Sequence, residues 1–335
     1  MNNPPLDFIH IGLGKCASTY LQHVFSKELS YEYVNILNLA ETARELARRN
    51  VDKVPLVQFP DVASKRKPRI ASSECFTFAF LNEPQFKGRM KALHEISPKL
   101  LGESKLTSKI LIMVRDPVNI LRSIHEQYIK QGGWLSYREY YLDFNELLVV
   151  TLNLKRIMTE YGKYFEIVVL SSDELKSDPE SFWEKYEGSL NVSAPSKEVC
   201  DFVANQKVSG NKSLGDRIFT LAMLNKVSAL KSVGLETSSE YQKLFAHESP
   251  RLTKSIKDSW IWGNRRLVEF ASDNDLRGVR KIFNCSEANS FQDLFIDADY
   301  QRHIERNFIA PLSEHSTISS SLLDSYQESL KSVVA

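Results

Sequence analysis

Long apolar segments are missing from this sequence of 335 residues. No run approaches the roughly 20 residues that a helix needs to cross a bilayer, so the sequence predicts no membrane span. The first residues contain neither a basic region nor an apolar stretch, and we expect no secretory signal. Excess charge is also missing. The formal net charge is +1, which argues against a protein that coats nucleic acid.

Cysteine is scarce and dispersed. The four cysteines lie far apart, form no Cys-x-x-Cys pair and have no histidine spaced to complete a zinc site: Cys16, Cys75, Cys200 and Cys285. The sequence therefore predicts no metal centre. Reduced thiols are the simplest interpretation. Together with the missing leader, they predict a cytoplasmic protein, while the oligomeric state cannot be read from the residues.

The residues that are present are those of an ordinary globular protein, with 42% apolar and 25% charged side chains. Continuous apolar runs predict buried strands near residues 8–12, 69–73, 109–115 and 165–171. Helical patterns separate these runs. This alternation predicts an α/β fold, with a central parallel sheet, right-handed crossovers and flanking helices.

The pattern changes after Asn205, where a polar connector precedes long helical patterns at 215–233 and 254–273. We expect a single domain whose α/β core covers residues 1–205 and carries the cofactor site. Residues 206–335 would then form a helix-rich C-terminal elaboration.

A glycine turn with a lysine joins the first predicted strand to the first predicted helix. The turn reads Gly12-Leu-Gly14-Lys15-Cys-Ala-Ser-Thr. Glycine lets the backbone turn sharply and approach a ligand without a Cβ. The free N–H groups of a helix N-terminus and a lysine charge favour an anion at the same place. The sequence therefore predicts a phosphate-type site.

Two common phosphate motifs fit this turn poorly. A Walker A loop ending at Gly14-Lys15 would place Ile9 at its first glycine and Cys16 at its Mg²⁺-binding hydroxyl. The spacing Gly12-x-Gly14-x-x-Ala17 satisfies the dinucleotide fingerprint. However, the acidic residue expected about 20 positions later is missing, because the next apolar run ends in Asn38. Dinucleotide binding stays open as an alternative.

A second strand–helix junction follows about a hundred residues later. The apolar run that starts at Lys109 ends in Arg115, Asp116 is a good N-cap, and Pro117 favours the first helical position. Ser123 lies about two turns into this helix, away from its apolar face. Arg115 offers a permanently charged, bidentate fork and Ser123 a short donor, so both can reach one phosphate.

Both junctions resemble the cofactor motifs of sulfotransferases that use 3′-phosphoadenosine 5′-phosphosulfate (PAPS). The string Gly-x-x-Lys-Cys-Ala-Ser-Thr-x-Leu-Gln is similar to their 5′-phosphosulfate loop, and Arg115 with Ser123 to their 3′-phosphate motif. The resemblance implies a three-layer fold like that of P-loop NTPases, PAPS as donor, 3′-phosphoadenosine 5′-phosphate (PAP) as product, and no metal. The cofactor-binding residues it implies are Gly12, Gly14, Lys15, Cys16, Ala17, Ser18, Thr19, Arg115 and Ser123, with Lys207 and Lys212 as candidates from the later basic connector.

The resemblance also implies in-line transfer of a sulfuryl group to an acceptor hydroxyl, with a carbohydrate-containing acceptor such as a glycan or glycolipid expected. Lys15 would stabilise the charge on the leaving phosphate oxygen. Glu74 follows a short strand, where such enzymes carry their base, and His125 is the alternative; His94 and His10 are weaker candidates. Two other functions stay open: a kinase-like or oxidoreductase enzyme that uses a nucleotide or dinucleotide, and a non-catalytic protein that binds PAP.

Overall fold

The computed structural model describes most of the N-terminal two thirds of the chain and its C-terminal end. The described residues are 5–51, 54–55, 67–78, 88–131, 133–205 (backbone only from 202), 222, 225, 294 and 296–333. The chain divides into two compact units. The first contains Met1–Leu121, Glu146–Ser209 and Ile296–Ala335, and the second contains Arg122–Asn145 and Gly210–Phe295. Each unit is considered by itself.

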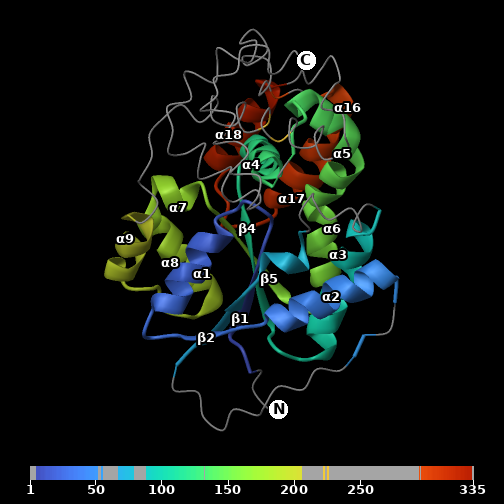
Figure 1. The fold of residues 1–335 in the computed structure, drawn as a ribbon. Coiled ribbons are helices and arrows are strands. Elements are labelled where there is room, and N and C mark those ends of the chain that lie inside the picture. The colour runs from blue at the N-terminus through green and yellow to red at the C-terminus, as the bar shows by residue number, and fades with distance from the viewer. Residues whose placement is uncertain are drawn as a thin grey trace, which may run out of the picture. The chain divides into compact units, whose positions relative to one another are not determined.

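The first unit is built on a five-stranded parallel sheet, so the predicted α/β class is confirmed (Figure 1). In chain order its strands are β1 (Phe8–Gly12), β2 (Glu32–Val34), β3 (Arg69–Ser72), β4 (Lys109–Val114) and β5 (Glu166–Ser171). Their order across the sheet is β2-β3-β1-β4-β5. His10 pairs with Ser72 on one side and with Leu111 on the other, which fixes the register at the centre.

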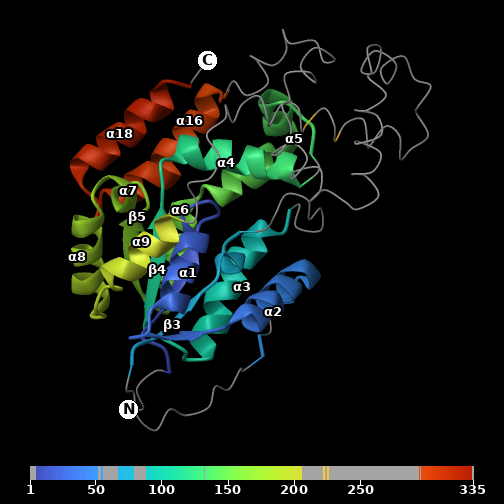
Figure 2. The same ribbon diagram turned by 60° about the vertical axis from the view of Figure 1, so that its left-hand side comes forward.

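The central strands are apolar throughout because both faces of the sheet are covered. All five residues of β1 are buried, and so are the last five of β4. The helices α1 (Ser18–Lys27), α8 (Pro179–Leu190) and α9 (Lys197–Asn205) lie on one face, and α2 (Leu37–Arg49) and α3 (Met90–Glu103) on the other (Figures 1 and 2). Short helices α6 (Leu154–Tyr161) and α7 (Glu174–Ser177) flank β5 in sequence.

The end of the chain returns to the sheet. It forms α16 (Ala298–Ile304), a π-helical turn (Glu305–Ile309), α17 (Ala310–Leu312) and α18 (Ser320–Lys331). Tyr326 of α18 contacts Ser171 at the carboxyl end of β5. Residues 296–335 therefore belong to the same unit as the sheet. The predicted division of the chain at residue 205 stays a prediction.

Two helices run from one unit into the other, namely α4 (Pro117–Lys130) and α5 (Tyr137–Thr151). Several predictions lie outside the described residues: Lys207, Lys212, and the helical patterns at 215–233 and 254–273 apart from Ala222 and Asn225, which are both helical. In the part of the chain that the structure describes, no helix is long and apolar enough to cross a membrane.

Candidate functional site

The loop between β1 and α1 has a backbone that approaches its neighbours very closely. A Cβ built on Gly12 would lie 2.0 Å from the Ser18 Oγ, and one on Gly14 would lie 2.7 Å from the Phe78 ring. Lys15 and Ala17 have φ angles of 71° and 63°. These angles lie in the left-handed region, which is unfavourable for any residue that carries a Cβ. The loop is therefore a tight, strained turn in which both glycines are required.

The helix α1, which follows this loop, begins without a side-chain cap. Ala17 occupies the N-cap position and cannot accept a hydrogen bond, and the first turn contains no acidic residue. Ser18 is buried, while Thr19 is exposed. A helix N-terminus of this kind suits an anion, because its N–H groups and its dipole are not neutralised by the helix itself.

Cys16 is a structural member of the loop. Its N–H donates to the Leu13 carbonyl at 3.2 Å, and its side chain is fully buried. Burial raises the pKa of the Cys16 thiol, and the thiol therefore stays protonated. Cys16, which the resemblance implies as a cofactor-binding residue, uses its N–H to close the turn in this structure.

The segment that follows β3 folds onto the loop and brings Glu74 to it. The Ser73 N–H donates to the His10 carbonyl at 2.9 Å, and the Thr77 hydroxyl donates to the Gly12 carbonyl. Between them, the Glu74 carboxyl lies near enough to the Lys15 ammonium and the Ser18 hydroxyl for both groups to act on its pKa. Burial raises the pKa of Glu74 above its ordinary value, and Lys15 and Ser18 oppose this shift. The structure thus brings together Lys15, Ser18 and Glu74.

Two buried histidines of the first unit support this arrangement from the core. His10, in β1, is fully buried, and its Nδ1 lies 2.7 Å from the Ser72 Oγ. His94, in α3, lies with its Nε2 2.9 Å from the Thr77 carbonyl. Burial lowers the pKa of His10 to about 3 and that of His94 to about 4, so both rings are neutral at physiological pH.

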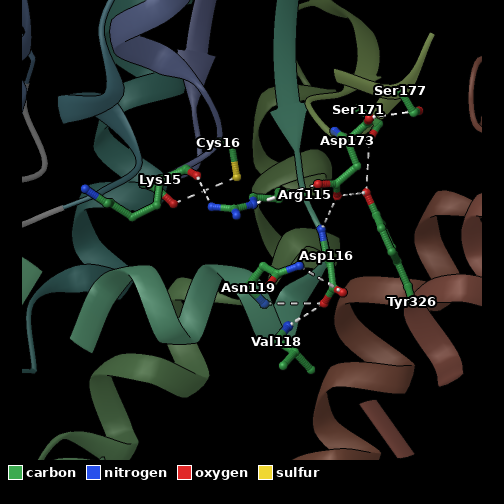
Figure 3. A network of polar contacts seen from close by, with 11 residues as sticks. Lys15, Cys16, Arg115, Asp116, Val118, Asn119, Ser171, Asp173, Ser177 and Tyr326 are labelled. Atoms are coloured by element: carbon green, nitrogen blue, oxygen red, sulfur yellow. Dashed lines mark hydrogen bonds and ion pairs between the residues drawn. The ribbon is translucent and has the colours of Figure 1, made fainter. Parts of the chain in front are cut away.

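Arg115 connects the end of β4 to the loop (Figure 3). One terminal N–H of its guanidinium donates to the Lys15 carbonyl at 3.5 Å, and its Nε lies 3.8 Å from the Asp173 Oδ1. The next residue, Asp116, accepts from the Val118 N–H at 2.8 Å and so caps α4, as the sequence predicts. Arg115 and the first loop are therefore joined at the carboxyl end of the sheet.

Sequence reasoning missed Asp173 and Tyr326, which complete this network. The Asp173 Oδ2 accepts from the Asp116 N–H at 2.7 Å and from the Tyr326 hydroxyl at 2.9 Å. A signal for Asp173 was available, because it lies two residues after the end of the buried run that forms β5, and the carboxyl ends of parallel strands meet at one edge. Tyr326 gives no such signal, since it lies in an ordinary amphipathic helix.

A cavity of about 380 Å³ adjoins the loop. Its walls come from the loop, α1, the segment after β5, α8 and α9: Ala17, Tyr20, Ser172, Leu175, Lys176, Pro179, Trp183, Cys200 and Asp201. Two aromatic side chains and several apolar ones face a few polar groups, which is the usual composition of a small-molecule pocket.

Ser123 and His125 belong to the second unit. Ser123 is half-buried on α4. His125 is buried, with its Nε2 2.9 Å from the Leu135 carbonyl and its ring against Tyr137 and Tyr140. Burial lowers the pKa of His125. Within this unit His125 holds the segment after α4.

No family model matches the chain, and no curated protein matches it. Among solved structures, the chain is similar to a sulfotransferase from Alicyclobacillus acidocaldarius, with 15% sequence identity and a TM-score of 0.39. The match covers 69% of this chain and 94% of that one. A likeness this distant assigns no function. In the described ranges, no group of three or more His, Cys, Asp or Glu side chains could hold a metal ion.

Proposed function

We propose that this chain is a sulfotransferase that moves a sulfuryl group from PAPS to an acceptor hydroxyl, with a glycan or glycolipid as the expected acceptor. The observation that carries the proposal is the meeting of Glu74, Lys15 and Ser18 at the uncapped start of α1. This arrangement combines a site for an anion with a carboxyl group that can accept a proton, which is what transfer to a hydroxyl requires.

The loop residues fit the 5′ end of such a donor. Gly12 and Gly14 lack the Cβ atoms that would clash with Ser18 and Phe78, so the loop can keep its tight turn, and Lys15 supplies a cation. Arg115 would hold the 3′-phosphate, and Ser123, Lys207 and Lys212 remain candidates for the same group. Tyr20 and Trp183 in the adjoining cavity offer aromatic faces for a purine. When bound, PAPS supplies an activated sulfuryl group.

The chain's own residues then have separate tasks. Lys15 and the N–H groups at the start of α1 stabilise negative charge on the phosphate side of the loop. Glu74 accepts the proton of the acceptor hydroxyl at a carboxylate oxygen. Its raised pKa brings its basicity closer to neutrality than that of an exposed glutamate, which improves general-base catalysis at physiological pH.

Calorimetry tests the cofactor assignment. PAP should bind in preference to ATP and NAD, and Lys15→Ala or Arg115→Ala should each weaken PAP binding by at least ~1.5 kcal/mol. Glu74→Gln should keep PAP affinity and lose transfer to an acceptor. Equal affinity for the three nucleotides would refute the proposal. Selective PAP binding without transfer to any acceptor would identify a non-catalytic PAP-binding protein instead.

A further inference from the structure

Arg115 can bind a phosphate well only if its guanidinium is held in place. A free arginine side chain has about 2 kcal/mol of rotamer entropy to lose, so prior immobilisation favours binding. Two contacts immobilise it here, the Lys15 carbonyl at 3.5 Å and the Asp173 carboxylate at 3.8 Å. The orientation of Arg115 therefore depends on the orientation of Asp173.

Asp173 is fixed through its other oxygen. Its Oδ2 accepts from the Asp116 N–H at 2.7 Å and from the Tyr326 hydroxyl at 2.9 Å, which leaves Oδ1 towards Arg115 (Figure 3). The Tyr326 and Ser171 hydroxyls lie 2.9 Å apart, and Ser171 accepts from the Asp173 N–H at 3.1 Å. Since Tyr326 donates its one hydrogen to the carboxylate, Ser171 donates to Tyr326. The donors and acceptors of this closed network are matched.

The helix α18 makes a second contact with the same region. The Ser329 hydroxyl lies beside Asp116 and lowers the pKa of that carboxyl, against the larger opposing effect of burial. Tyr326 and Ser329 are three residues apart and therefore share one face of α18. One face of the C-terminal helix thus holds both the carboxylate that orients Arg115 and the one that caps α4.

We infer that Tyr326 is a positioning residue for the 3′-phosphate site, acting through Asp173 on Arg115. This inference rests on the proposed function, in which Arg115 binds that phosphate. Tyr326 is 1% exposed, so its ring stays packed when only the hydroxyl is removed. Loss of the hydroxyl leaves the Asp173 Oδ2 with the Asp116 N–H as its remaining donor in this network, so Asp173 is held less firmly and Arg115 can leave its binding orientation more easily.

The test compares two nucleotides that differ in the 3′-phosphate, PAP and adenosine 5′-monophosphate. Tyr326→Phe should weaken PAP binding about tenfold, which corresponds to about 1.4 kcal/mol, and leave adenosine 5′-monophosphate binding within about twofold. In an Arg115→Ala background, the same substitution should have no further effect on PAP. Tyr186→Phe is the matched control, because it removes a buried phenol hydroxyl that lies beside Tyr31.

Equal weakening of both nucleotides, or unchanged PAP affinity, would overturn the inference while the proposed function stands. If the wild type binds the two nucleotides equally, the proposed function fails and the inference fails with it. Should Tyr326→Phe not fold, Ser171→Ala removes the hydroxyl that donates to Tyr326 and gives the same comparison, with a smaller but still PAP-selective loss expected.

Discussion

Replacing Gly14 by alanine should distort the loop between β1 and α1. The added Cβ would lie 2.7 Å from the Phe78 Cγ and Cδ2 atoms and 2.8 Å from Cε2. Carbon atoms in favourable contact are about 3.5–4.0 Å apart, so the overlap is close to 1 Å. Phe78 is 3% exposed and its ring has little room to retreat. Overpacking of this kind costs about 1–3 kcal/mol.

Gly188, in α8, offers the matched control, because no atom lies within 4 Å of a Cβ built there. Alanine at this helical position should stabilise the protein by ~0.5–1 kcal/mol. Urea unfolding of both variants measures the effect on stability, and calorimetry with PAP measures the effect on binding. Gly14→Ala should lower the unfolding midpoint and weaken PAP binding at least tenfold, whereas Gly188→Ala should raise the midpoint and leave the affinity unchanged.

A second substitution identifies the cause. If the clash with Phe78 is responsible, Phe78→Leu in the Gly14→Ala background should recover part of the lost stability and affinity, since the smaller side chain gives the Cβ space. A Gly14→Ala protein that is as stable as the wild type and binds PAP equally well would refute the packing of Phe78 on this loop.

Two further predictions concern the core histidine and the cap of α4. Burial lowers the pKa of His10 to about 3 in the folded protein from 6.5, so the unfolded chain binds more protons and stability falls as the pH drops from 6.5 towards 3. In His10→Gln, the melting temperature should therefore fall less steeply as the pH drops from 6.5 towards 3. An unchanged slope would contradict the conclusion that the His10 ring is buried and neutral. Asp116→Ala should cost more stability than Asp178→Ala, which removes only the cap of α8, worth about 1 kcal/mol. Equal losses in thermal unfolding would show that Asp116 adds no more than a cap.

The parts of the fold that the sequence predicted are those set by local pattern. The predicted strands near 8–12, 69–73, 109–115 and 165–171 match β1, β3, β4 and β5 within one residue at each end, because each contains consecutive buried residues that are mainly apolar. The apolar run that ends in Asn38 overlaps the first turn of α2, which begins at Leu37.

The parts that sequence could not supply depend on contacts between distant segments. Phe78 packs against Gly14, and Tyr326 against Asp173, over separations that leave no periodic trace in the sequence. The place of Glu74 near the first loop could be predicted, because the carboxyl ends of neighbouring parallel strands meet and β3 lies beside β1. Asp173 satisfies the same rule through β5 and β4, so applying it to every strand would have found this residue too.

Two carboxylates near the loop illustrate how environment separates roles for chemically similar groups. Asp173 accepts hydrogen bonds from a backbone N–H and a phenol on one oxygen and pairs with Arg115 on the other, so both of its oxygens are committed to holding neighbours. Glu74 meets Lys15 and Ser18 in a buried setting that raises its pKa. A desolvated carboxylate is a better proton acceptor near neutral pH than one in water. The same edge of the sheet therefore provides one carboxylate suited to positioning and one suited to chemistry.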